Sequence, residues 1–206
     1  RGTEDTELLM SGMDALSNFA DDSSVTARLI KQGIVDLVVE CMEKYDRDKA
    51  LMERTVRLLA ILTCCDEGVQ RIVDLDGIQA LLTAMDQHKD QHDFLTNSSV
   101  AMQNIAANSG ARTQIGVMGG AGTIISLMEA NMNDLQNANQ TFQAEMLNLL
   151  TRLTNDEGLS RTIAAEGMHV IMAAVNKYEQ DPAFLTAAFT LLGRLACVVE
   201  NLKLIV

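Results

Sequence analysis

The chain has no tryptophan and a single proline among its 206 residues, and aromatic residues make up only 3% of it. A core without large rings has to be filled by aliphatic side chains. The twelve methionines suit that task, because flexible thioethers fill irregular gaps between helices. Scarce proline removes the residue that most disrupts a helix interior. With a hydrophobic content of 48%, this composition predicts a folded, helical protein and not a disordered one.

Positive charge is also scarce, because 16 Lys and Arg stand against 28 Asp and Glu and give a formal net charge of −12. Electrostatic binding to DNA, RNA or an anionic membrane depends on clustered Lys and Arg, so we expect no nucleic-acid or membrane partner. No apolar run approaches the ~20 residues of a membrane span. The chain does not open with a signal peptide. We therefore expect a cytoplasmic protein, with cytoskeletal or nuclear association as variants.

Cysteine is used sparingly and without a metal-binding pattern. The four residues include an adjacent pair and no CxxC spacing; they are Cys41, Cys64, Cys65 and Cys197. This arrangement predicts neither a zinc site nor a disulfide framework. Their apolar, helical neighbours predict buried free thiols in a reducing compartment.

One stretch of sequence recurs along the chain. Residues 102–120, MQNIAANSGARTQIGVMGG, contain the end of one helix with Asn104, a polar break and a short helix that ends in glycine. Residues 16–33 follow the same order, with the same interval of 15 residues between Asn18 and Gly33. Looser copies begin at Leu59, Leu150 and Leu192. The position of the asparagine, called the asparagine position below, recurs at intervals of 43, 43, 48 and 42, at Asn18, Ile61, Asn104, Arg152 and Arg194.

A period in the forties is typical of armadillo and HEAT repeats. The ends LSNFA at 16–20 and MQNIA at 102–106 match the third-helix ending of the armadillo family. The glycine that precedes apolar pairs matches at Gly33, Gly77, Gly120 and Gly167. The chain therefore resembles an armadillo-repeat protein over nearly its whole length. The resemblance implies an all-α, right-handed solenoid of three-helix repeats that forms a single domain.

The repeats expected within residues 1–206 begin and end partway through a unit, which predicts either a piece of a longer array or an array that caps itself on a partner. Residues 6–20 are a lone third helix, four repeats follow at 21–64, 65–107, 108–154 and 155–198, and a further repeat starts at 199–206. The expected helices are 6–20, 25–32, 34–44, 50–64, 67–76, 77–87, 94–107, 110–118, 120–131, 141–154, 157–166, 168–177 and 182–198. The polar segment 131–140 lengthens the third repeat and is expected to be a surface loop. Apolar faces at 1–20 and 192–206 predict self-association through these truncated ends.

No enzyme site emerges from the remaining motifs. His88 and His92 stand four apart in a polar link and supply too few ligands for a metal, so we read the link as a solvated loop. The glycines around Gly119 follow a helix and lack the spacing of a phosphate loop. The other histidine, His169, lies in an apolar helix and is expected to be structural. We expect no catalytic residue, no metal and no cofactor.

In armadillo arrays the third helices line a concave groove, which the asparagine position and the residue one turn before it face. The resemblance thus implies a partner-binding groove whose polar residues are Asp14, Asn18, Arg54, Arg57, Asn97, Asn104, Asn148, Arg152 and Arg194. The groove lacks the tryptophans with which importin-α reads basic peptides, so the chain is not of that subtype. Its arginines are more similar to the β-catenin type, which holds acidic segments, because arginine binds carboxylates in a bidentate manner.

The function implied is a non-enzymatic scaffold that binds an extended, partly acidic polypeptide along this groove. One alternative is an architectural subunit of a cytoskeletal or axonemal assembly, which apolar patches on the second helices would favour. Another is a chaperone or GTPase-regulator module, since the armadillo family includes both. Such folds carry many functions through their surface residues, so the resemblance alone does not choose among these.

Overall fold

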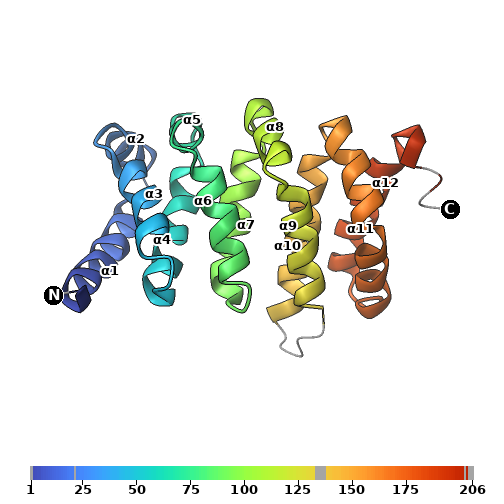
Figure 1. Cartoon of the computed structure of the whole chain (residues 1–206), viewed down its shortest axis with the longest axis horizontal. Coiled ribbons are helices and arrows are strands. Elements are labelled where there is room, and N and C mark those ends of the chain that lie inside the picture. Colours follow the sequence, from blue (N-terminus) through green and yellow to red (C-terminus); the bar gives the residue numbers. More distant parts are fainter. Residues whose placement is uncertain (1, 21, 133–137, 202, 204–206) are drawn as a thin grey trace. The chain divides into compact units, whose positions relative to one another are not determined.

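The computed structural model describes residues 2–20, 22–132, 138–201 and 203, and within these ranges it is helical with no strand (Figure 1). This confirms the predicted all-α class. The chain divides into two compact units, Arg1–Ile105 and Ala106–Val206, called unit 1 and unit 2 below. Each unit is described by itself, and the repeat boundaries and the hand of a superhelix that joins both units stay predictions.

The helices of unit 1 pack in rows of equivalent helices from successive repeats. Third helices α1, α4 and α7 pack side by side, second helices α3 and α6 pack on each other, and so do first helices α2 and α5. Their bounds are α1 Gly2–Phe19, α2 Ser23–Lys31, α3 Ile34–Lys44, α4 Lys49–Leu62, α5 Asp66–Asp74, α6 Gly77–Gln87 and α7 His92–Ile105. Apart from the start of α1, these ends lie within two residues of the predicted ones.

Unit 2 follows the same plan. Third helices α10 and α12 pack side by side, and α9 packs on α11. The bounds are α8 Ser109–Val117, α9 Gly120–Ala130, α10 Ala138–Leu153, α11 Glu157–Lys177 and α12 Pro182–Ala196, followed by a 3-10 turn η1 at Val199–Asn201. Of the predicted loop 131–140, residues 133–137 lie outside the described residues, and so do residues 202 and 204–206 of the predicted further repeat.

Short polar side chains begin five of the helices by accepting hydrogen bonds from their first backbone N–H groups. Asp22, Asn108 and Asp156 do so for the first helices α2, α8 and α11. The equivalent residue before α5 is Cys65, which makes no such side-chain bond. Asp48 and Asp181 cap the third helices α4 and α12, the latter with Pro182 at its first turn, as predicted.

The aliphatic core is anchored by one bulky residue ten positions before each asparagine position. In α4, α7, α10 and α12 this residue is fully buried, as Leu51, Phe94, Phe142 and Phe184. The equivalent residue of α1, Leu8, is 75% exposed. In the later repeats a second helix packs on the third helix of the same repeat.

The turn between first and second helices uses left-handed backbone in three repeats. Gly33 has φ 87° and Gly119 has φ 73°, the left-handed conformation that glycine adopts most readily at the end of a helix. In the second repeat the left-handed residue is Asp76, with φ 54°, and Gly77 already belongs to α6. Gly77 is needed for another reason: a Cβ there would lie 3.1 Å from Ile72 O and from Val39 Cγ2.

The fourth repeat departs from the prediction of separate helices at 157–166 and 168–177. The structure has one continuous helix, α11, of 21 residues through Gly167. Gly167 does not adopt a positive φ; instead a Cβ at this position would lie 3.0 Å from Ile125 Cδ1 of α9. The glycine therefore permits close packing of two helices and does not end one.

The cysteines also differ from prediction. Cys41 is buried, and burial, with a smaller effect of Glu40, raises the pKa of its thiol. Cys64 and Cys197 are exposed and Cys65 is half-buried. The adjacent pair lies in the turn between α4 and α5, where a side chain can reach the surface although the flanking sequence is apolar.

Candidate functional site

Four of the predicted groove residues gather on α1 and α4 of unit 1. Asp14 accepts hydrogen bonds from Arg54 Nε at 3.0 Å and from Arg57 Nη2 at 2.5 Å. Asn18 and Glu53 line the same open hollow, which has a volume of about 380 Å³. The prediction that Asp14, Asn18, Arg54 and Arg57 share one face is consistent with this geometry, because α1 and α4 lie side by side.

The bonds within this cluster were not foreseen. Asp14 lies on α1, the third helix that precedes α4 by one repeat, so the carboxylate that satisfies both arginines comes from the protein itself. The three side chains are 35–47% exposed, and ion pairs of this kind contribute only about 0.2–1 kcal/mol each. Asp14 therefore orders the two arginine side chains, but both stay exposed enough to bind a stronger ligand.

A second hollow of unit 1 is lined by α4, α7 and the turn from α1 into α2, and is called the Cys64 hollow below. Its volume of about 460 Å³ is in the range of ligand-binding pockets. Its apolar lining includes Ala60, Ile61 and Val100 beside Cys64, and its polar lining is Ser23, Thr26, Arg57 and Asn97. Among the described lining residues, Arg57 alone carries a charge, so this surface is more apolar than the neighbouring cluster.

Asn104 is used inside the protein. Its amide Nδ2 donates to Ala60 O and to Thr63 Oγ1, both at 3.3 Å, and contacts Cys64 Sγ at 3.7 Å. The half-buried side chain thus ties α7 to the end of α4. Asn18, at the equivalent position of α1, has no preceding third helix in this chain and is exposed.

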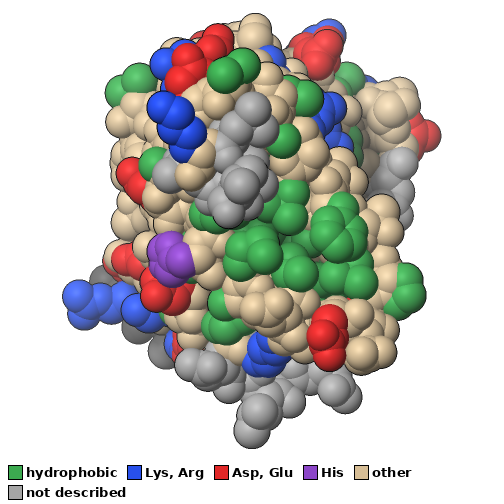
Figure 2. Space-filling view, turned by 90° about the vertical axis from the view of Figure 1, so that its right-hand side faces the viewer, with side chains coloured by type: hydrophobic (Ala, Val, Ile, Leu, Met, Phe, Trp, Pro, Cys, Tyr) green, Lys and Arg blue, Asp and Glu red, His purple; other side chains and the backbone are tan. Residues whose placement is uncertain are grey.

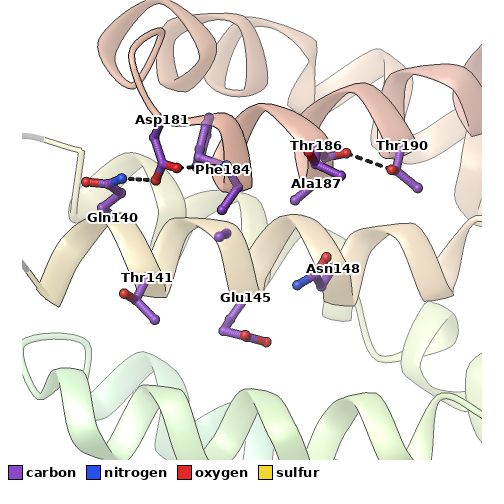
Figure 3. A pocket seen from close by; sticks show the side chains of 11 residues that line it. Gln140, Thr141, Glu145, Asn148, Asp181, Phe184, Thr186, Ala187 and Thr190 are labelled. Atoms are coloured by element: carbon purple, nitrogen blue, oxygen red, sulfur yellow. Dashed lines mark hydrogen bonds between the residues drawn. The ribbon is translucent and has the colours of Figure 1, made fainter.

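The hollow of unit 2 lies between α10 and α12 and has a volume of about 370 Å³ (Figure 3). Asn148 lines it, as do Glu145, Ala187 and Thr190 at related third-helix positions. Asp181 accepts hydrogen bonds at the upper rim from Gln140 Nε2 and from the backbone N–H of Ala183. Besides Phe184 and three alanines, the described lining contains acids, hydroxyls and amides and no Lys or Arg, unlike the two third-helix hollows of unit 1 described above.

The two predicted arginines of unit 2 lie outside this hollow. Arg152 on α10 and Arg194 on α12 are exposed, and Arg194 Nη1 donates to Asn155 Oδ1 at 2.6 Å. The arginines are therefore divided between the units, with Arg54 and Arg57 in unit 1. That all of them share one continuous face stays a prediction.

Three carboxyls of unit 1 have a lowered pKa. Hydrogen bonds from the Arg71 guanidinium lower the pKa of Asp36 and join α5 to α3. The hydroxyl and backbone N–H of Ser24 lower the pKa of Asp22, the cap of α2. The Lys49 ammonium lowers the pKa of Asp90, with an Nζ–Oδ2 distance of 2.6 Å. Ionised carboxylates are thus part of the folded state of this unit.

Sequence reasoning missed a recurring bond at the end of the third helices. The last carbonyl groups of a helix lack intrahelical donors. Here a polar side chain five or six residues later supplies one, as Thr26 Oγ1 does to Ala20 O at 2.7 Å, Arg112 Nη1 to Ala106 O at 2.7 Å, and Asn201 Nδ2 to Leu195 O at 2.9 Å. A polar residue six positions after the acceptor carbonyl was the sequence signal that could have predicted these bonds.

The reading of the His88 link as solvated is wrong for His88 itself. This residue ends α6 and is buried, with Nε2 2.6 Å from Asp46 O and Nδ1 bonded to Gln91. Its ring lies 4.9 Å from that of Phe94, as Tyr178 lies 4.9 Å from Phe184 in the fourth repeat. His88 therefore supplies the ring at the C-terminal end of the second helix α6. Its spacing of 43 residues from Tyr45, which ends the second helix α3, indicates this role.

Three further observations concern His169, metal ligands and membrane spans. His169, expected to be structural, is exposed on α11. Within the described part of the chain, no group of three His, Cys, Asp or Glu side chains is placed to hold a metal ion. Among the same residues, no helix combines the length and the apolar character of a membrane span.

Repeated three-helix units with caps at equivalent positions define the chain as a helical repeat protein of the armadillo type. A family model described as "GAC ARM domain" matches residues 1–134, which is more than half of the chain. The chain belongs to this armadillo-repeat family, as its residue pattern predicted. Membership does not contradict the exclusion of the importin-α subtype.

Solved structures agree on the fold. A crystal structure of an engineered protein from the Northeast Structural Genomics Consortium is similar over 91% of this chain, with a TM-score of 0.76 and 19% identity. The chain spans 44% of that protein's length. A second engineered protein from the same consortium is similar over 93% of this chain and 92% of its own length, with a TM-score of 0.63 and 16% identity. At such identities the likeness shows the fold alone. Among curated proteins none matches.

Proposed function

We propose that the chain is a non-enzymatic scaffold whose third helices bind an extended, partly acidic polypeptide segment. Armadillo-repeat domains generally serve as protein-interaction scaffolds, and membership of that family supports the general role. The finer proposal depends on one observation: equivalent positions of successive third helices line open hollows in both units. A surface of that kind offers successive contacts to a chain that lies across it.

The proposed division of labour follows from the side chains. Arg57, Arg152 and Arg194 accept the acidic residues of the segment, while Asn18, Asn97 and Asn148 contact its backbone. Each exposed ion pair contributes about 0.2–1 kcal/mol, so affinity is a sum over several contacts. We place this activity in the cytoplasm, where the exposed thiols of Cys64 and Cys197 stay reduced.

The test begins with random peptide display on the immobilised full chain, which supplies a binding peptide when no natural partner is in hand. The enriched peptide is then titrated against the double variant Arg152→Glu/Arg194→Glu. We expect binding at least tenfold weaker, which corresponds to about 1.4 kcal/mol, with helicity and melting temperature nearly unchanged.

The matched control is Arg161→Glu, which reverses an exposed arginine of α11 that pairs with Glu157 away from the third helices. Its affinity should equal that of the unchanged chain. Equal affinity for the double variant as well would move the site off the third helices, and a collapsed melt would show that the two arginines are structural.

A second candidate function is packing into a fixed assembly. It is favoured by exposed apolar residues on the second helices and on the last two helices, α11 and α12. Leu37 of α3 and Met172 of α11 are exposed. Figure 2 shows apolar side chains gathered on the end of unit 2 that carries α11 and α12, where Phe189 is also exposed. We infer that such faces support self-association. Sedimentation should show a concentration-dependent increase in mass that Phe189→Ser reduces, and a strictly monomeric chain would contradict it.

A further inference from the structure

The electrostatics of unit 1 raise a difficulty for an acidic ligand. By sequence the unit contains 19 acidic and ten basic residues, so a partner rich in carboxylates is repelled by the unit as a whole. The arginine cluster is already partly neutralised, because Asp14 bonds to both Arg54 and Arg57. Charge alone is therefore a weak source of affinity at this surface.

The Cys64 hollow supplies what the cluster lacks. Ala60, Ile61 and Val100 present apolar atoms to an open volume of about 460 Å³, and Val100 on its wall is 38% exposed. Burying apolar surface yields roughly 25 cal/mol per Å², and apolar anchors seated in pockets dominate most protein interfaces. A single large side chain placed here would contribute more than an exposed ion pair.

Arg57 joins the two surfaces. It lines both the Cys64 hollow and the hollow that holds Asp14 and Asn18. Its side chain is 47% exposed while bonded to Asp14, and a guanidinium has five N–H donors, so a second carboxylate can bind it without displacing the first. A carboxylate beside an apolar group in the hollow would meet the one charged residue among the described lining.

We propose that the Cys64 hollow binds a large apolar side chain of the partner segment, whose adjacent acidic residue pairs with Arg57. This deepens the proposed function and rests on it, because the occupant is part of the same extended segment. The apolar group supplies the affinity, and Arg57 selects an acidic neighbour over a basic one. The hollow of unit 2, with Glu145 and Asp181 and no described Lys or Arg in its lining, would not make the same selection.

Cys64 allows a direct test by disulfide exchange on the full chain. Three fragments share one phenyl ring on a cysteamine-capped disulfide and differ in a carboxylate, an amide or an amine. The Cys64 thiolate attacks the capped disulfide, forms a mixed disulfide with the fragment and releases cysteamine. Cys65→Ser removes the neighbouring thiol, and peptide-level mass spectrometry measures the fragment retained at Cys64 as reductant increases.

We expect Cys64 to retain the carboxylate fragment at least fivefold better than the amine. Cys197, exposed in unit 2, serves as the control thiol of the same molecule and should show a preference below twofold. Arg57→Gln should bring the preference at Cys64 below twofold, and Val100→Ser should weaken retention of all three fragments about threefold. Both variants are confirmed as folded by their thermal melts.

Equal preferences at Cys64 and Cys197, or a preference that survives Arg57→Gln, would overturn the proposal. The outcome is separate from that of peptide display. Displayed peptides that depend on Arg152 and Arg194 but leave Cys64 accessible to the fragments would keep the scaffold and reject the apolar anchor. A fragment preference at Cys64 without any displayed binder would keep the hollow and reject the extended groove.

Discussion

Unit 1 and unit 2 share one repeat plan and differ in the chemistry of their third-helix surfaces. Unit 1 presents Arg54 and Arg57 beside an apolar hollow, whereas the hollow of unit 2 has Glu145 and Asp181 among hydroxyls and amides. The buried residues, caps and turns that determine the fold recur from repeat to repeat. Surface residues are not needed for the fold and can differ between repeats. The comparison teaches that the fold and the ligand preference of this chain are encoded by different sets of residues.

The largest expected effect tests how tightly unit 1 is packed. A Cβ on Gly68 of α5 would lie 1.9 Å from Leu62 O, a backbone atom that cannot move alone. Gly68→Ala should therefore lower the free energy of unfolding by about 3 kcal/mol or more, as overpacking does. Gly193→Ala in unit 2 makes the same change in open space and should raise it by up to about 1 kcal/mol. Urea unfolding measures both, and equal effects would contradict the packing at Gly68.

The second prediction concerns the side-chain cap that helix α5 of unit 1 lacks. Cys65 makes no capping bond where Asp22, Asn108 and Asp156 make one. Cys65→Asp should stabilise the chain by about 1 kcal/mol, because the new carboxylate can accept from the first N–H groups of α5. Asp156→Ala in unit 2 should cost a similar amount. A denaturant midpoint that Cys65→Asp leaves unchanged would show that α5 gains nothing from a cap.

A smaller effect is expected from releasing the arginines of unit 1. Asp14→Asn removes the carboxylate that bonds to Arg54 and Arg57, so an acidic displayed peptide should bind up to about fivefold more tightly, within the ~0.2–1 kcal/mol of an exposed pair. Glu145→Gln in unit 2 leaves those arginines unchanged and is the comparison variant. Isothermal titration measures both, and a loss of affinity in Asp14→Asn would mean that Asp14 orders the site more than it competes for it.

The smallest effect is the acid sensitivity of unit 1. Asp22, Asp36 and Asp90 have a lowered pKa in the folded chain, so each adds stability that is present above the unfolded value of about 4 and is lost as pH falls through the lower folded value. Melts recorded from pH 5 downward should show this loss. Arg71→Gln should reduce the part due to Asp36, whose pKa Arg71 lowers, and an unchanged pH profile in that variant would contradict the assignment.

Much of the fold could be predicted because its signals are local and repeated. The period of the asparagine position located the helices, and the break predicted between residues 25–32 and 34–44 is present at Gly33. The break predicted at Gly167 is absent, because a glycine permits a turn without requiring one, and contact with Ile125 decides its role. That contact joins residues 42 positions apart, which no local pattern reports.

The candidate site was harder to predict for the same reason. Six of the nine predicted groove residues line one of the three third-helix hollows, and Asn104, Arg152 and Arg194 do not. The sequence did not show that Asp14 bonds to Arg54 and Arg57 or that Asn104 donates to the end of α4. Each of these bonds depends on a side-chain rotamer and on the register of two neighbouring helices. His88 was misread because its polar neighbours outweighed its alignment with Tyr45.

The continuous helix α11 has a mechanical consequence. Gly33, Asp76 and Gly119 give their repeats a pivot at which backbone dihedrals can change while two short helices turn against each other. The last repeat has no such pivot, and its 21 residues form one stiff rod about 30 Å long. A change of angle between the first and second helices is therefore open to the first three repeats, whereas in the fourth repeat the two helical segments of α11 move together.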